Sequence, residues 1–482
     1  MVADDFDQWS DAMSRLRSEE STVGCRRRWL WRFRPSVPDA AAARSSNLPP
    51  GPRLPAVMQT VMWALVPVWF GEECMARYGP LFTARILGFG NVVYVCTPDG
   101  IRRILRDDAD KFDAAAANKS IKFVVGEHSL LMSDGAEHTE RRRILMRPLH
   151  GCNMTDYVVL MESIIDQEIR QWRVNARIKL LDCLQRVTLE VMMRAVFGIT
   201  DSVRLDRLRV LVPRLLDISP VIILLPAMRR SFGGFGPWVR FQRLLHEVDD
   251  IIFAEIAERR VDPVSDGTDV VSILLANEEA ALTDQELRDH MVTLLAVGQE
   301  TTATQLAWFF ERVLRTPDAL EQIVTAVAEQ DWKLIDAAIH ESIRARPTTM
   351  DVGRVALKPW HANGYDFPAG TMFAVSLGLL HHSPQLHDKP DVYLVSRFSP
   401  EEPPSTHFMP FGGGNHRCLG ASLAMIEMRT VISTIMRHVR LEPARTAAER
   451  VACKGPMLVP RHGTAVVVTE NRLMRRDPSV SR

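Results

Sequence analysis

Apolar residues recur at helical spacing along most of the chain, and the longest such pattern covers residues 283–314. This segment reads TDQELRDHMVTLLAVGQETTATQLAWFFERVL. Thr283 and Glu286 have the spacing of a capping box, which predicts that a helix begins here. Apolar residues occur on nearly every side of the middle of the segment. We therefore expect a long helix that passes through the interior of the protein.

Strand-like patterns are few. The runs LFTARIL at 81–87 and NVVYVC at 91–96 are joined by a glycine-containing turn and predict two paired strands. MLVP at 457–460 and TAVVVT at 464–469 predict further strands near the C-terminus. Helical patterns dominate elsewhere, and one of them begins at Leu419. The predicted fold class is mostly α with a minor β portion (α+β).

The composition excludes several classes of protein. Lys+Arg and Asp+Glu are both 59, so the net charge is zero and the basic excess of a nucleic-acid-binding protein is missing. The seven cysteines are scattered, without a CxxC or Cys/His spacing. Neither a disulfide framework nor a zinc site is expected, and a reducing cytoplasm is the predicted compartment.

No transmembrane segment is expected. The most apolar run, AVMQTVMWALVPVWF at 56–70, is too short and is interrupted by Gln59 and Pro67. The first twenty residues are polar and lack the apolar core of a signal peptide. CRRRWLWRFR at 25–34 mixes arginine with aromatic residues, which indicates either a weak contact with a membrane surface or a solvated tail.

The stretch FMPFGGGNHRCLG at 408–420 carries the strongest chemical signal. Cys418 precedes a predicted helix, where the helix dipole and free N–H groups lower the pKa of a thiol. Three consecutive glycines allow a tight turn that brings backbone N–H groups toward the sulfur. A buried, inert cysteine is the ordinary alternative. A nucleophile needs a base held by an orienting acid, and His416 has no such acid nearby in the sequence. A thiolate ligand for a large, flat cofactor explains the glycines better.

This stretch closely resembles the haem-binding loop of the cytochrome P-450 family, Phe-Gly-x-Gly-x-His-x-Cys-x-Gly. Every fixed position matches. The resemblance implies that Cys418 is the thiolate ligand of the iron of haem b and that His416 reaches a haem propionate. The remaining loop residues that it assigns to the cofactor are Phe411, Gly412, Gly414 and Gly420.

The resemblance extends over nearly the whole chain. It begins at the proline-rich LPPGPR, which by itself predicts a stiff, extended entry into the folded body. The length alone favours about three domains at roughly 150 residues each. The resemblance instead implies a single cytochrome P-450 domain over 47–470, with a polar and basic tail at 1–46 and a C-terminal tail at 471–482. In that fold the haem lies between the long central helix and the helix after the cysteine loop.

Two further segments fit the same family. In ESIR, Glu341 and Arg344 are spaced i, i+3 on one helix face, which is by itself a common solvated ion pair. In the family such a pair is locked to a second arginine, and Arg397 is the matching residue here. DGAEHTERRRILMRPL at 134–149 places His138 and Arg142 at i, i+4. These two resemble the family's propionate clamp, and Arg354 resembles its third member, since buried carboxylates need partners.

The long helix contains VGQETT at 297–302. A glycine inside a helix costs about 1 kcal/mol relative to alanine, so the segment is either a flawed buried helix or a local widening for a small molecule. It resembles the family's oxygen-activation segment, with Gly298, Glu300 and Thr301 at the matching positions. Glu300 and Thr301 are then expected to deliver protons. Val297 departs from the usual alanine or glycine, and HHSP at 381–384 departs from the usual Arg-Asp-Pro.

Together these resemblances imply a haem-thiolate monooxygenase (oxidoreductase, EC 1.14 class) of the soluble bacterial type. It would insert one atom of O₂ into an apolar organic substrate, with electrons that come from NAD(P)H through a ferredoxin and its reductase. Segments 119–132, 217–230 and 347–350 are expected to line the substrate pocket. An acidic ferredoxin would be steered to a basic proximal face. That face is formed by Arg141, Arg143, Arg147, Arg417 and Arg429.

Two alternatives remain open on the sequence. A peroxide-driven peroxygenase of the same fold usually lacks the acid–alcohol pair that Glu300 and Thr301 form here. A non-catalytic haem-binding or lipid-binding protein would need neither residue.

Overall fold

The computed structural model describes residues 48–149, 154–218, 222–223, 228–231, 235–262, 269–276, 282–398 and 407–474. These described residues group as one compact unit. The basic and aromatic segment 25–34 lies outside the described residues. The predicted fold class, mostly α with a minor β portion, is confirmed.

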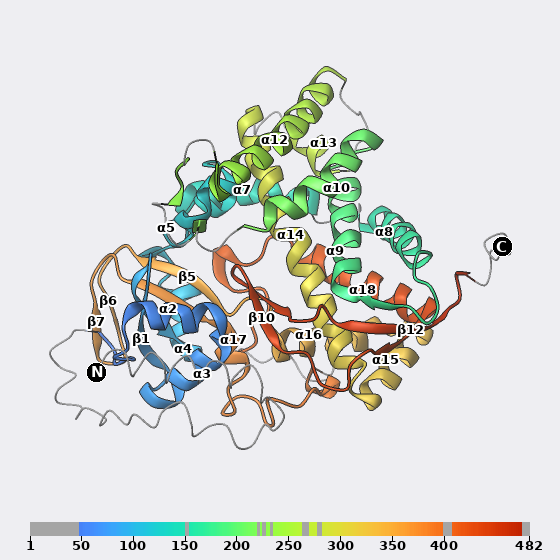
Figure 1. Ribbon diagram of the computed structural model, residues 1–482. Helices are drawn as coiled ribbons and strands as arrows, with labels where there is room; N and C mark the ends of the chain where they lie inside the picture. The colour runs from blue at the N-terminus through green and yellow to red at the C-terminus, as the bar shows by residue number, and fades with distance from the viewer. Residues whose placement is uncertain are drawn as a thin grey trace. The chain divides into compact units, whose positions relative to one another are not determined.

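Helices make up most of the described chain (Figure 1). They are α2 Ala56–Leu65, α3 Pro67–Tyr78, α4 Pro98–Arg102, α5 Ala114–Asn118, α6 Lys122–Val125, α7 Gly135–Met146, α8 Met154–Ile169, α9 Leu180–Val191, α10 Ser202–Leu216, α12 Pro237–Val261, α13 Val270–Leu275, α14 Asp284–Val313, α15 Pro317–Glu329, α16 Trp332–Ala345, α17 Leu377–His381 and α18 Ala421–His438.

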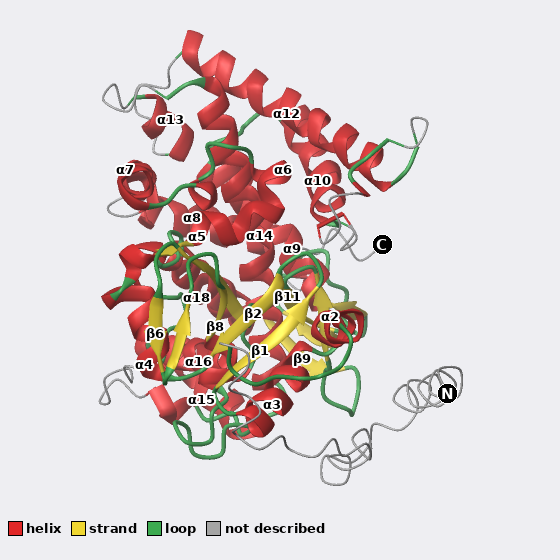
Figure 2. Ribbon diagram, turned by 90° about the vertical axis from the view of Figure 1, so that its left-hand side faces the viewer, coloured by secondary structure: helices red, strands yellow, loops and turns green. Residues whose placement is uncertain are grey.

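The strands gather on one side of the body, away from α10, α12 and α13 (Figure 2). They are β1 Leu81–Ile86, β2 Gly90–Val95, β3 Phe112–Asp113, β4 Arg177–Lys179, β5 Asp351–Ala356, β6 Trp360–Ala362, β7 Tyr365–Phe367, β8 Met372–Ser376, β9 Val439–Pro443, β10 Val451–Lys454, β11 Met457–Pro460 and β12 Ala465–Asn471.

The main sheet has the strand order β1-β2-β8-β5-β3. The predicted pair 81–87 and 91–96 forms its antiparallel hairpin β1–β2, in which Leu81 lies opposite Val95. Strand β8 joins β2 in parallel and pairs antiparallel with β5. The predicted C-terminal strands are also present, as β11 and β12. Through β5 this sheet brings Asp351 and Arg354 to the same region as the cysteine loop.

Helix α14 runs through the middle of the body (Figure 1). The predicted capping box is present: the Thr283 side chain accepts from the Glu286 backbone N–H, and the Glu286 carboxylate accepts from the Thr283 backbone N–H. Residues on all sides of its C-terminal half are buried, including Trp308, whose indole N–H donates to the Leu458 carbonyl at 2.8 Å. The expectation of an interior helix is confirmed, and α14 gives the site a rigid wall.

The apolar run 56–70 does not form one helix, because it divides into α2 and α3 at Pro67. Among the described residues, Gly414–His438 has the length and apolar composition of a membrane span, with a mean hydropathy of 1.3. More than half of that window (56%) is buried inside the body, as in the core helix of a globular protein.

Candidate active site

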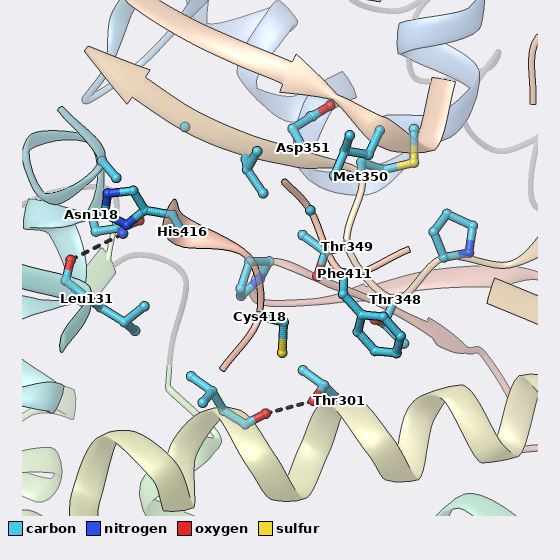
Figure 3. A pocket seen from close by; sticks show the side chains of 18 of the residues that line it. Asn118, Leu131, Thr301, Thr348, Thr349, Met350, Asp351, Phe411, His416 and Cys418 are labelled. Carbon is cyan, nitrogen blue, oxygen red and sulfur yellow. Dashed lines mark hydrogen bonds between the residues drawn. The ribbon is translucent and has the colours of Figure 1, made fainter. Parts of the chain in front are cut away.

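A cavity of about 930 Å³ lies between α14, the segment 409–420 and strand β5. Thr301 of α14 and Cys418 both line it, and the sulfur of Cys418 points toward the helix that carries Thr301 (Figure 3). Most of the other lining residues are apolar. The cavity therefore combines a thiol, a hydroxyl and a large apolar surface.

The loop before α18 is held in shape by its backbone. The Cys418 N–H donates to the Phe411 carbonyl at 2.8 Å, which closes the turn. Gly412 and Gly414 have φ of +73° and +66°, a region that favours glycine. A Cβ atom on Gly414 would lie 1.7 Å from the carbonyl oxygen of Leu105. Gly414 thus lets the loop pack against the backbone below it, whereas Gly412 and Gly420 line the cavity.

The Cys418 side chain is exposed to the cavity. Burial within the body raises the pKa of its thiol, while the Gly420 N–H and the charges of Arg142 and Arg417 lower it. The predicted net lowering of this pKa by the helix terminus is therefore wrong for the free thiol, because desolvation is the larger effect. A metal cation would supply the positive charge that the thiolate lacks.

Four basic side chains meet at one side of the cavity: His138 and Arg142 of α7, Arg354 of β5, and His416 of the loop. The His138 and His416 rings lie 3.8 Å apart, centroid to centroid. Burial, then the charges of His416 and Arg142, lowers the pKa of His138 to about 4. Burial also lowers the pKa of Arg142 and Arg354. Two arginines and two N–H-bearing imidazoles crowded in this way favour an anion beside them.

Asp134 is a carboxylate in contact with this cluster. It caps α7 through the Gly135 N–H, and its Oδ1 lies 3.2 Å from His416 Nε2. Burial raises the pKa of Asp134, but hydrogen bonds from His416 and from two backbone N–H groups lower it further, so the net shift is downward. Asp134 alone does not balance the charges of Arg142 and Arg354. The cluster has room for further negative charge.

These residues fit an iron porphyrin. Among the described residues, no group of three or more His, Cys, Asp or Glu side chains could hold a bare metal ion. A metal must then bring most of its own ligands, as haem does, and take one from the exposed Cys418 sulfur. The apolar walls suit the ring, and the basic cluster suits its two carboxylates.

One face of α14 forms the wall opposite the thiol. Val297, Gly298 and Thr301 all line the cavity, and the Thr301 hydroxyl donates to the Val297 carbonyl at 2.7 Å. Val297 is 41% exposed in the middle of a buried helix, because it faces the cavity. A Cβ atom on Gly298 would lie 3.0 Å from the sulfur of Met192, so the missing side chain lets Met192 pack closely.

Glu300 takes a different direction from Thr301, as expected for consecutive residues about 100° apart on a helix. Its buried carboxylate accepts from Gln185 Nε2 at 3.3 Å and forms an ion pair with Lys454. Among the described residues that line the cavity, Glu300 does not appear. The sequence predicted both an acid and a hydroxyl beside a bound small molecule, and of the two residues only Thr301 lines the cavity.

Glu341, Arg344 and Arg397 meet as the sequence indicated. Glu341 and Arg344 are fully buried and form a two-point ion pair at 2.7 and 2.8 Å. Arg397 Nε lies 3.4 Å from the same carboxylate, and Arg344 also donates to the carbonyls of His381 and Pro390. This network holds α16 to the chain that leads into the cysteine loop.

Each of the three segments predicted to line the substrate pocket contributes some residues to the cavity lining. Segments 119–132 and 347–350 contribute to the lining; of 217–230, which lies partly outside the described residues, Ile223 does. The sequence reading missed the walls formed by α2–α3 and by the β10–β11 hairpin. The apolar character of the run 56–70, which cannot span a membrane, is the sequence feature that could have indicated the α2–α3 wall. The residues missed there are Trp63, Ala64, Leu65, Pro67, Cys453, Gly455, Pro456 and Leu458.

The fold has close counterparts among solved structures. The cyanobacterial CYP120A1 with bound retinoic acid aligns with a TM-score of 0.77 and 22% identity, over 88% of this chain and 99% of that one. The heme domain of cytochrome P450DA aligns with a TM-score of 0.75 and 19% identity, over 88% and 98%. At these identities the likeness shows the fold alone.

Sequence comparison gives the family. The family profile described as cytochrome P450 matches residues 49–466. Cytochrome P450 135B1 of Mycobacterium tuberculosis is 37% identical over 438 residues, which cover 89% of this chain and 93% of that protein. Cytochrome P450 135A1 of the same species is 32% identical over 443 residues, which cover 90% and 98%. The chain belongs to the cytochrome P450 family, which assigns to it a haem cofactor and the general chemistry of a haem monooxygenase.

Proposed function

We propose that this protein is a cytoplasmic monooxygenase that inserts one oxygen atom of O₂ into an apolar organic substrate. It takes electrons that originate from NAD(P)H through a ferredoxin-type donor. The observation that carries the proposal is the arrangement of Cys418 and Thr301, which line one largely apolar cavity of about 930 Å³. The Cys418 thiolate is the iron ligand, and the Thr301 wall is the side where substrate binds.

When bound, the haem supplies the activation of O₂, a reaction that the thiolate ligand promotes by donating electron density. The chain positions the reactants and moves protons. Arg142, Arg354, His138 and His416 hold the propionates, replacing water around two buried carboxylates. The apolar walls exclude water and hold the substrate by its hydrocarbon surface.

Thr301 is the residue that we assign to proton transfer. A hydroxyl both donates and accepts hydrogen bonds, and that of Thr301, which lines the cavity, donates to Val297 O and keeps its lone pairs free to accept. It can therefore orient a water molecule above the thiol. Glu300 would take part only after its carboxylate leaves Lys454.

The electron donor is proposed to dock on the proximal face, but fewer charges are available there than the sequence implied. Arg141 pairs with Glu137, Arg143 with Glu140 and Arg429 with Asp336, at 2.6 to 2.8 Å. Arg147 and Arg417 are exposed, and no ion pair joins either to another described residue. These two arginines are the proposed contacts for an acidic partner.

The position of Glu300 favours one second candidate function, that of a peroxide-driven enzyme. A peroxide-driven enzyme needs no protons delivered to O₂, and the acid of this chain is held outside the cavity by Lys454. Turnover of an apolar substrate with a ferredoxin, its reductase and NADPH, compared with turnover with hydrogen peroxide alone, tests the two. Product only with the electron-transfer chain supports the monooxygenase. Equal or faster product formation with peroxide supports the peroxygenase.

A further inference from the structure

One wall of the cavity has no part in the chemistry above. It is formed by Trp63, Leu65 and Pro67 of α2–α3, by Tyr94 of β2, and by Asp351, the first residue of β5. We call these five residues the sheet wall. In Figure 3, Asp351 lies on its strand on the side of the cavity opposite α14, with Cys418 between Asp351 and Thr301 in that view.

Asp351 has no protein partner for its charge within the described part of the chain. Its Oδ1 is buried and makes no hydrogen bond. Ser376 lies directly across from it in the β5–β8 register, and the Ser376 hydroxyl is the one neutral neighbour that interacts with the Asp351 carboxylate. Burial raises the pKa of Asp351 to about 6, and the Ser376 hydroxyl is the one group that opposes this shift. No described arginine, lysine or histidine lowers it.

The charge of Asp351 affects the pKa of a neighbouring residue of the sheet wall. Burial, followed by the Asp351 carboxylate, raises the pKa of Tyr94 well above its ordinary value. Tyr94 is therefore a neutral phenol, and the wall holds one carboxylate among apolar and neutral groups. In its ionised form this carboxylate accepts hydrogen bonds but cannot donate them.

An unpaired carboxylate in an apolar cavity costs folding free energy, so a protein seldom keeps one without a partner. Several other buried acids of the described chain have cationic partners, as Glu341 has Arg344 and Glu300 has Lys454. Asp351 and Glu427 of α18 depart from that pattern, since each lines the cavity and has one buried carboxylate oxygen without a hydrogen bond. Of the two, Asp351 belongs to the sheet wall, on the side of the cavity opposite α14 in Figure 3. A ligand group that donates a hydrogen bond would complete the site.

We propose that Asp351 binds the polar end of the substrate, and that this end is a hydrogen-bond donor, a hydroxyl or a protonated amine, on an apolar skeleton. The inference rests on the proposed function, because that function makes this cavity the substrate site. A substrate held by Asp351 presents its hydrocarbon part to Thr301 and to the thiol side. A ligand with a carboxylate at the same end meets a like charge and is disfavoured.

The test compares four probes of equal chain length: n-decanol, n-decylamine, n-decanoate and decyl methyl ether. Binding to the purified holoenzyme is measured by titration calorimetry, which does not depend on the haem spectrum. The alcohol and the ammonium are expected to bind about tenfold tighter than the ether and the carboxylate, the usual gain from a charge-assisted hydrogen bond.

Substitutions of Asp351 test whether this side chain causes the preference for hydrogen-bond donors. Asp351→Asn keeps the shape and removes the charge, so it should abolish the preference for the amine over the ether. Asp351→Ala should abolish the preference for the alcohol as well. Asp366→Asn, at an exposed carboxylate of β7, is the matched control and should change neither.

Equal affinities of the four probes in the wild type overturn the proposal, and so does a donor preference that survives Asp351→Ala. An amine that binds iron directly, seen as a nitrogen-ligand spectrum, contradicts the proposed orientation. The wild-type comparison decides the question even if a variant fails to fold. The ferrous–CO band, recorded in parallel, separates this outcome from failure of the proposed function.

Discussion

Lys454, the last residue of β10, forms an ion pair with Glu300 of α14, across 154 positions of sequence. The Glu300 carboxylate is buried, and the Lys454 side chain is 36% exposed. The neighbours Cys453 and Gly455 line the cavity. The pair therefore ties a strand of the cavity wall to the acid of the oxygen-activation segment.

Lys454→Met should destabilise the fold by about 1–2 kcal/mol, less than for a fully buried pair, because the lysine is partly solvated. The loss arises from a buried carboxylate left with a single neutral partner, Gln185. The free energy of unfolding in urea measures it. Lys358→Met, which breaks an exposed pair with Asp110, is the control and should cost much less. Glu300→Gln in the Lys454→Met background should recover most of the loss, and no recovery would show that the charge is not the cause.

Cys418→Ser and Cys418→His should remove the thiolate signature of the ferrous–CO complex. The thiol is exposed to the cavity and has N–H and arginine neighbours that stabilise its anion. The measurement is the CO difference spectrum of the purified protein after reduction. Cys453→Ser, at a second cysteine that lines the same cavity, should leave the spectrum unchanged. An imidazole-type band in the wild type would refute the ligand assignment.

Arg147→Glu should slow reduction of the haem by a reduced, acidic ferredoxin by roughly tenfold at low ionic strength. Arg147 is exposed, and no described residue forms an ion pair with it, so its charge is available to a partner. The rate is followed by stopped flow, and the difference should shrink as salt is added. Arg240→Glu on α12 has the same charge change at another exposed position and should have little effect. Rates that do not depend on ionic strength would argue against docking at this face.

Local patterns predicted the elements of this fold well. The capping box at Thr283 and the alternation in β1 and β2 are each decided by residues close in sequence. The position of Cys418 before a helix was predicted for the same reason, but its pKa was not. Desolvation depends on every segment that surrounds the sulfur, and spacing along the chain does not contain that information.

The same limit explains what was missed at the site. Glu300 and Thr301 are adjacent in sequence and were predicted to act as a pair. Consecutive residues point in different directions on a helix, so the two side chains lie in different surroundings. The partner of Glu300 comes from a strand 154 positions later. Asp351 could not be predicted as a site residue, because a lone aspartate forms no sequence motif. Its unusual feature, a carboxylate without a partner, exists only in the folded chain.

Val297→Ala should tighten the binding of bulky azoles by roughly three- to tenfold, as expected when side-chain volume that crowds a ligand is removed. Val297 faces the cavity one residue before Gly298, where the family usually has alanine or glycine. Spectral titrations with azoles of increasing size measure the effect, and small azoles should be little affected. Val292→Ala is the matched control, since Val292 is buried on the same helix and does not line the cavity. An unchanged order of affinities would show that Val297 does not limit the space above the iron.

Thr301→Ala should leave haem binding and the stability of the fold nearly unchanged, while it uncouples NAD(P)H oxidation from product formation. The only hydrogen bond that the structure gives to the Thr301 side chain is to Val297 O, within its own helix, so little folding free energy is lost among the described contacts. Without the hydroxyl, the water that Thr301 orients loses its anchor, and protons arrive late or at the wrong oxygen. NAD(P)H would still be consumed, and hydrogen peroxide would replace product. The ratio of product to NAD(P)H oxidised should fall by roughly tenfold or more, as for the loss of a positioned proton-transfer group.

Thr304→Ala is a close control, because Thr304 is buried on the same helix, does not line the cavity and has no hydrogen-bond partner for its hydroxyl among the described residues. If the Thr301 variant couples as well as the Thr304 variant, Thr301 has no part in proton delivery, and the peroxide-driven alternative gains support.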